Sequence, residues 1–157
     1  MIGTTDSGAN GNKSTPGFGV DDAWIVRLDA AGNKLWDQTV GGAGYEYLGE
    51  VVEMPAGGFI TAGWSQSPPG GNKTSPQFGG GSDGWVICLN ANGSLRWEQS
   101  FGGNNSDFLV GVAKTSARYH LTNHTTVRRL LREFHETGRS RAGKSEEEKL
   151  CGADTGS

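Results

Sequence analysis

Hydrophobic and polar residues alternate in short runs over the first two thirds of the chain, as they do in half-buried β-strands. In the first run, Trp24, Val26 and Leu28 fall on one face of an extended chain, and Ile25 and Arg27 fall on the other. Segments rich in Gly, Asn and Pro separate the runs, which is typical of turns between antiparallel strands. The pattern predicts strands at about 24–28, 35–40, 48–54 and 59–65, followed by a long loop at 66–82.

The same pattern occurs twice. Residues 22–52 align with 83–113 at an offset of 61, with 11 of 31 positions identical. Upstream, residues 3–19 align with 63–79 at an offset of 60, with 8 of 17 identical. The identical positions include one aspartate, two tryptophans and a Gly-Gly pair: Asp22/Asp83, Trp24/Trp85, Trp36/Trp97 and Gly41-Gly42/Gly102-Gly103. We therefore divide residues 1–113 into two tandem units, about 1–61 and 62–113, each expected to form four antiparallel strands.

Three motifs resemble a family of bacterial surface repeats of roughly 60 residues: the run Asp22–Asp37, the pair Gly41-Gly42 and the run Gly71–Pro76. Members of that family are similar to β-propeller proteins, and long members often end in a type IX secretion sorting domain. The resemblance implies an all-β fold of blade-like repeats, a partial β-propeller, in an exported, surface-associated, non-catalytic scaffold. Because the chain shows no leader, further repeat or sorting domain, we expect it to be a fragment that starts within a blade.

Charge and composition divide the chain near residue 113. Residues 1–113 carry 5 Lys and Arg against 11 Asp and Glu, a balance of −6, whereas residues 114–157 carry 9 against 6, a balance of +3. The net charge of −3 does not favour nucleic-acid binding. The sequence contains no apolar run long enough for a membrane span and no export signal. Cys88 lies in an apolar strand and is expected to be a small buried side chain.

The segment 114–157 departs from the repeat. Val127, Leu130, Leu131 and Phe134 have helical spacing, which predicts a helix at about 125–137. The residues from about 140 onward are polar and are expected to be disordered. A frameshift is one explanation for so abrupt a change, and the flanking DNA read in all frames tests it.

The tail contains one sequence that matches the phosphate-binding P-loop, residues 138–145 with Lys144 and Ser145. A P-loop requires a buried strand before it and a helix after it, so that backbone N–H groups surround the phosphates. Here a polar segment precedes the motif, and Glu146, Glu147 and Glu148 follow it. We therefore interpret nucleotide binding through 138–145 as the weakest of the alternatives.

Other candidate sites are explained more simply by structure or solvation. The possible zinc ligands are His120, His124, His135 and Cys151, and the possible nucleic-acid contacts are Arg128, Arg129, Arg132, Arg139 and Arg141. The histidines are not expected to share one helix face, and acidic residues interleave with the arginines. Asp22 and Asp83 are expected to cap turns in preference to binding calcium. The sequence therefore assigns no catalytic residue, no metal ligand and no cofactor.

The leading hypothesis is a structural or binding module, with the exposed loops Gly8–Val20 and Gly70–Ser82 as its contact surface. Aromatic and Asn side chains in those loops suit a protein or a glycan, and the sequence does not choose between them. Open sheet edges are expected to favour self-association. The alternative is a piece of a glycan-active propeller enzyme whose active residues lie in other blades.

Overall fold

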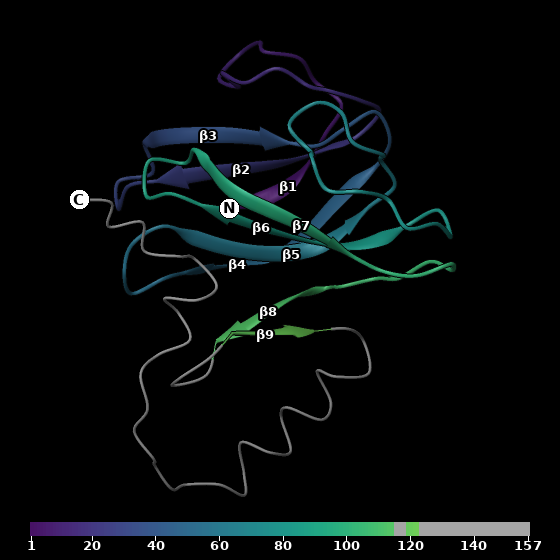
Figure 1. Ribbon diagram of the computed structural model, residues 1–157. Helices are drawn as coiled ribbons and strands as arrows, with labels where there is room; N and C mark the ends of the chain where they lie inside the picture. The colour runs from purple at the N-terminus through teal and green to yellow at the C-terminus, as the bar shows by residue number, and fades with distance from the viewer. Residues whose placement is uncertain (115–118, 123–157) are drawn as a thin grey trace, which may run out of the picture.

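The computed structural model describes residues 1–114 and 119–122, which fold as three antiparallel sheets without a helix (Figure 1). The first sheet has the order β1-β2-β3, with β1 at Ile2–Thr5, β2 at Asp22–Leu28 and β3 at Lys34–Val40. The second has the order β4-β5-β6-β7, with β4 at Glu46–Glu53, β5 at Phe59–Ser65, β6 at Asp83–Leu89 and β7 at Leu95–Phe101. The third pairs β8 at Gly111–Lys114 with β9 at Tyr119–Thr122. The all-β prediction is confirmed for this part of the chain.

Because every neighbouring pair is antiparallel, the connections gather at two opposite ends of the sheets. The loop end, at the right of Figure 1, carries the short connection 41–45 and the longer connections 6–21, 66–82 and 102–110. The turn end, at the left, carries the tight turns 29–33, 54–58 and 90–94. Gly32 and Gly93 occupy aligned positions in two of these turns, and both have a φ of 86°, a left-handed conformation that favours glycine.

The second sheet lies between the other two and supplies both hydrophobic cores. Trp85 and Ile87 on β6 are fully buried against the first sheet, in a cluster with Ala23 and Ile25 of β2. Cys88 on the opposite face of β6 is also fully buried, in a cluster that includes Val112 of β8. Both faces of β6 are therefore covered, which explains why it reads as a continuous apolar run. The expectation that Cys88 is a small buried side chain is confirmed.

The predicted strands form, but their grouping into one sheet was wrong. We expected the strands at 24–28, 35–40, 48–54 and 59–65 to form one sheet and the loop 66–82 to lead to the next. Instead the chain changes sheet at 41–45, and the loop 66–82 connects β5 to β6 within the second sheet. The reason is that β5 and β6 pair along seven consecutive residues, so the length of the loop between them does not separate them.

Strand β9 lies beyond residue 113, inside the segment that we expected to depart from the repeat. The predicted helix at 125–137, the predicted disorder from about 140 and the P-loop match at 138–145 lie outside the described residues. So do His124, His135, Cys151 and the five tail arginines. Within the described part, no helix has the length and apolar character needed to cross a membrane.

Candidate functional site

A buried carboxylate of the first sheet anchors the loop 6–21. Asp37 on β3 accepts hydrogen bonds from the Ser14 amide at 2.9 Å, from the Ser14 hydroxyl, and from the Trp24 indole Nε1 at 3.1 Å. Lys34 Nζ also lies 2.7 Å from Asp37 Oδ1. One carboxylate thereby joins the loop to two strands, which fixes the loop at the loop end of the sheet.

Glu98 on β7 performs the same role for the loop 66–82. It accepts from the backbone amides of Thr74 at 2.8 Å and Ser75 at 2.7 Å, and from the Trp85 indole at 2.5 Å. Glu98 aligns with Asp37, and Trp85 aligns with Trp24. We call Asp37 and Glu98 the anchoring carboxylates. They are committed to structure, because their oxygens already accept several donors.

Each anchored loop contains one buried lysine. Lys73 is 2% exposed, donates to the Ser75 carbonyl at 2.7 Å, and lies 6.0 Å from the centre of the Trp85 ring. Burial lowers the pKa of its ammonium group, although the nearby charges of Glu98, Asp83 and Glu46 oppose that shift. Lys13 holds the aligned place in the first loop and is 6% exposed. These cations are therefore interior groups and are not available to a ligand on the surface.

The anchoring carboxylates should make stability fall in acid. Burial alone raises the pKa of both groups, but the hydrogen bonds to Asp37 and Glu98 outweigh it and leave each pKa below its ordinary value. A group with a lowered folded-state pKa stabilises the fold above its unfolded pKa and loses that contribution as the pH falls through its folded pKa. We expect urea unfolding to show falling stability between about pH 5 and about pH 2. The Glu98→Gln variant should lose part of this dependence; an unchanged slope would contradict the assignment.

Two further carboxylates cap turns at the loop end, as expected. Asp22 Oδ2 accepts from the Phe18 amide at 2.6 Å, and Asp83 Oδ2 accepts from the Phe78 amide at 2.7 Å. The other oxygen of each has no hydrogen-bond partner in the described residues. Asp22 Oδ1 lies 2.0 Å from where a Cβ on Gly41 would be, so the glycine backbone occupies the space before it.

Glu46 is a third kind of buried carboxylate, and its oxygens accept from the Gly42 amide at 2.9 Å and from the hydroxyls of Ser65 and Ser67 at 2.8 and 2.6 Å. The described residues contain no cluster of three or more His, Cys, Asp or Glu side chains suited to a metal ion. The buried acids at the loop end thus hold connections in place.

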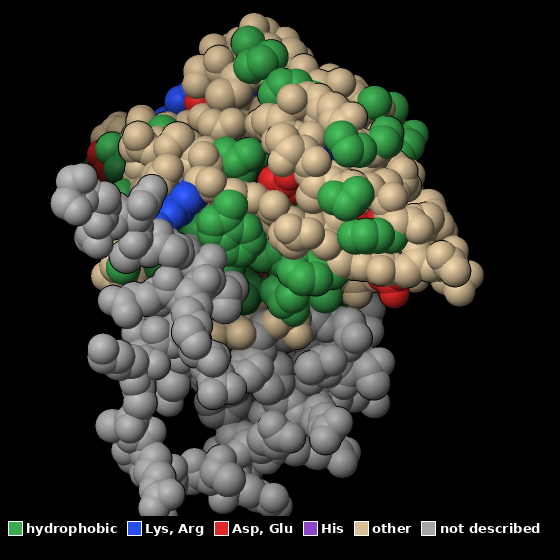
Figure 2. Space-filling model, viewed as in Figure 1, with side chains coloured by type: hydrophobic (Ala, Val, Ile, Leu, Met, Phe, Trp, Pro, Cys, Tyr) green, Lys and Arg blue, Asp and Glu red, His purple; other side chains and the backbone are tan. Residues whose placement is uncertain are grey.

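Large exposed hydrophobic side chains concentrate at the loop end. We define the loop-end patch as Phe18, Val20, Tyr45, Tyr47, Phe78, Phe101 and Phe108, which are each between 36% and 48% exposed, together with the half-buried Trp64. Figure 2 shows several separate hydrophobic groups on the right-hand side, where the loop end lies. Exposed aromatic side chains gathered on loops are more typical of a binding surface than of a solvated one.

Three members of the patch pack on one another. The rings of Tyr47 and Trp64, paired across β4 and β5, are stacked with centres 6.0 Å apart and planes 21° apart. The Phe108 ring meets Trp64 edge-on at 5.7 Å. We call these three residues the aromatic triad. Tyr47 and Phe108 remain 44% and 48% exposed, so the triad presents ring surface to solvent that contacts within the chain do not use.

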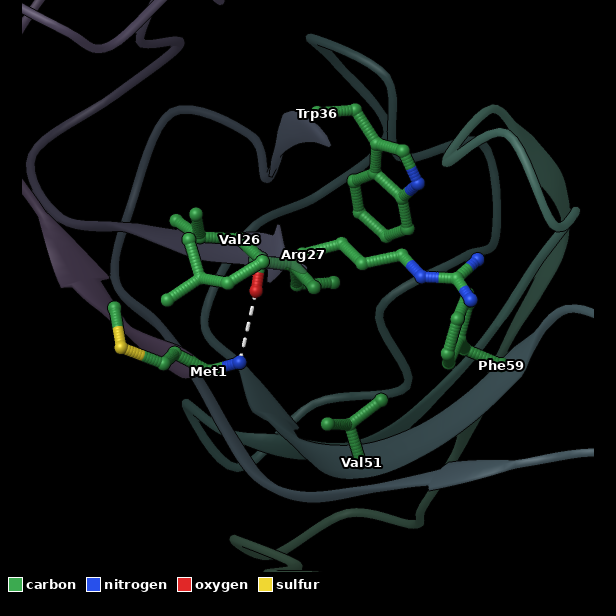
Figure 3. A pocket seen from close by; sticks show the side chains of 8 residues that line it. Met1, Val26, Arg27, Trp36, Val51 and Phe59 are labelled. Carbon is green, nitrogen blue, oxygen red and sulfur yellow. Dashed lines mark hydrogen bonds between the residues drawn. The ribbon is translucent and has the colours of Figure 1, made fainter. Parts of the chain in front are cut away.

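A pocket of about 260 Å³ lies at the turn end between the first two sheets (Figure 3). Its lining is mostly apolar: Met1, Ile25, Val26, Arg27, Leu28, Trp36, Val51 and Phe59. The Arg27 guanidinium lies 5.0 Å from the centre of the Phe59 ring, donates to the Ala91 carbonyl at 3.2 Å and pairs with Glu53 at 3.5 Å. Its donors are thus already directed at the chain, and the pocket offers a ligand little polar recognition.

The loops proposed from the sequence as the contact surface are only partly available. Gly8–Val20 and Gly70–Ser82 lie at the loop end, but Lys13, Lys73 and Ser75 within them are buried. Sequence reasoning missed the aromatic triad, since its members come from β4, β5 and the connection 102–110. The alignment of Tyr47 with Phe108 was the one signal that pointed to it.

Comparison of the chain with protein-family models and with curated proteins finds no match to either.

Proposed function

We propose that this protein is a non-catalytic binding scaffold whose ligand-binding surface is the loop end. The stacked sheets act as blades of a partial β-propeller, and the parent protein is exported to the cell surface. The motif resemblance supports the blade architecture and the location. The anchoring carboxylates are not candidates for a general acid or base, because such a group needs an oxygen free to reach a substrate.

The aromatic triad carries the proposal. A ring face is electron-rich, and the C–H groups of a sugar ring carry partial positive charge, so the two surfaces attract when stacked. Asn104 and Asn105 in the same connection as Phe108 are exposed and supply amide groups for sugar hydroxyls. This combination of ring surface and small polar groups favours a polysaccharide as the ligand.

Affinity gel electrophoresis tests the proposal, with mannan, laminarin, xylan or dextran embedded in native gels. We expect at least one polysaccharide to retard the protein and Trp64→Ala to reduce the retardation by about tenfold in affinity. Leu35→Ala is the matched control, because Leu35 is 57% exposed on β3 and lies outside the patch. Unchanged mobility in all four gels, or equal retardation of both variants, would count against the proposed function.

A further inference from the structure

In the first sheet, one edge of β1 has no partner strand in the described residues, although the equivalent edge of the aligned strand β5 is paired. β1 pairs with β2 on one edge and with no described strand on the other. β5, which aligns with β1 at an offset of 60, pairs with β6 on one edge and with β4 on the other. The free edge of β1 therefore corresponds to the edge that receives β4. An unpaired edge exposes N–H and C=O groups that another strand can bind.

A glycine on that edge of β1 indicates how closely another strand could approach it. A Cβ on Gly63 of β5 would lie 1.9 Å from the Tyr47 carbonyl oxygen and 2.7 Å from Leu48 Cα, so the backbone of β4 requires glycine there. Gly3 is the aligned residue on β1, and a Cβ on it would meet nothing within 4 Å. No atom of the described chain fills the space beside Gly3 that a side chain would occupy. The space matches the backbone of a strand like β4.

The turn 29–33 of the first sheet also lacks, among the described residues, a contact that the aligned turn 90–94 of the second sheet makes. In the second sheet, the carbonyl of Ala91 accepts from the Trp36 indole at 3.2 Å, and a Cβ on Gly93 would lie 2.6 Å from the same indole. The aligned residues in the first sheet are Ala30 and Gly32. A Cβ on Gly32 would meet nothing within 4 Å, and the described residues give the Ala30 carbonyl no donor.

The second sheet carries an indole side chain that fits against the turn 29–33 as Trp36 fits against the turn 90–94. Trp97 on β7 aligns with Trp36 on β3. Trp36 Nε1 donates to a turn of the neighbouring sheet, whereas Trp97 Nε1 is buried with no hydrogen-bond partner in the described part of the chain. Leaving a buried donor unpaired costs about 1–3 kcal/mol. A turn like that of Ala30, placed against Trp97, removes this cost.

We propose that the free edge of β1 binds a second copy of this chain, joined head to tail. Residues 107–109 of one copy, which lead into β8, take the place beside β1 of the next copy that residues 46–48 of β4 take beside β5. By the alignment, Phe108 then lies opposite Thr4 and Leu109 opposite Gly3, as Tyr47 and Leu48 lie opposite Trp64 and Gly63.

The same arrangement of the two copies places Trp97 of the first copy beside Ala30 and Gly32 of the second. Each copy thus presents two different, complementary surfaces, one on each side of its second sheet. A heterologous contact of this kind produces a closed ring or an open filament and not an isolated symmetric dimer. The assembly involves Phe108, which also belongs to the aromatic triad, but its sedimentation test needs no polysaccharide and changes Gly3, which lies outside the triad.

Sedimentation velocity over a wide range of protein concentration tests the assembly. We expect the wild-type protein to associate as concentration rises and Gly3→Val to remain a monomer, because its side chain fills the space for the incoming backbone. Gly8→Val is the matched control, since a Cβ on Gly8 also meets nothing within 4 Å but lies away from the edge. A wild-type protein that stays monomeric, or a Gly3→Val variant that associates equally, overturns the proposal.

A cross-linking experiment tests the register. Thr4→Cys and Phe108→Cys are made as separate proteins in a Cys151→Ser background, mixed, and oxidised. The disulfide between copies should form in the mixture and be at least about tenfold less abundant in either protein alone. Association of the wild-type protein without this disulfide would place the contact elsewhere and contradict the proposed pairing.

Discussion

Replacing Gly63 by alanine should lower the free energy of unfolding by about 3 kcal/mol or more. The new Cβ would lie 1.9 Å from the carbonyl oxygen of Tyr47 and 2.8 Å from its carbonyl carbon. These are backbone atoms of the paired strand β4, which cannot rotate away as a side chain would. Relief therefore requires β4 and β5 to separate locally, with loss of their hydrogen bonds. Urea unfolding followed by tryptophan fluorescence measures the change.

Gly3→Ala is the matched control for this experiment, because Gly3 and Gly63 are aligned strand residues and neither has a positive φ. Nothing lies within 4 Å of a Cβ on Gly3, so we expect a change within about 0.5 kcal/mol under conditions where the protein is a monomer. Equal losses in the two variants would mean that the β4–β5 pairing does not determine the cost at Gly63.

Replacing Glu98 by glutamine should cost about 3 kcal/mol. The carboxylate accepts from two backbone amides and one indole, and it lies near the buried ammonium of Lys73. Glutamine keeps one acceptor oxygen but turns an NH₂ group toward donors, and it removes the negative charge near Lys73. Both the loop 66–82 and the packing of Trp85 should loosen as a result. Chemical denaturation measures the loss, and near-ultraviolet circular dichroism reports on the indole.

Glu53→Gln provides the comparison, since the Glu53 side chain is 65% exposed and pairs with Arg27 among the described residues. An exposed ion pair contributes little, so this variant should change stability by less than about 1 kcal/mol. A loss at Glu98 no larger than the loss at Glu53 would contradict its assignment as an anchoring carboxylate.

The strands and their buried faces were predictable because a strand has a period of two, and the alternation of Trp24, Ile25 and Val26 shows it directly. The capping role of Asp22 was also predictable, since short carboxylates bind nearby backbone amides in turns. Both features depend on residues that are close in sequence.

The division into sheets was not predictable in the same way. A repeated unit reads identically wherever its first strand is placed, so the alignment leaves open which four strands share a sheet. The decisive contacts are the pairing of β5 with β6 and the bend at Gly41, where Asp22 lies too close for a side chain. These are tertiary contacts that neither alternation nor loop length reveals.

The candidate site was missed for a related reason. Tyr47 and Trp64 meet because β4 and β5 pair in a register that includes a bulge between Leu48 and Val51. Phe108 joins them from the next connection. The sequence drew attention to the long Gly- and Asn-rich loops instead, although the anchoring carboxylates bury part of each loop. An aromatic cluster assembled across three segments requires the register to be known first.

Amide hydrogen exchange measured by mass spectrometry tests the central claim, that like sheets stack on both sides of the second sheet. We predict the slowest exchange in β6, whose two edges are paired and whose two faces are covered, and faster exchange in β1 than in its aligned strand β5. Uniformly fast exchange in β6, or equal protection of β1 and β5 in the monomer, would contradict the account.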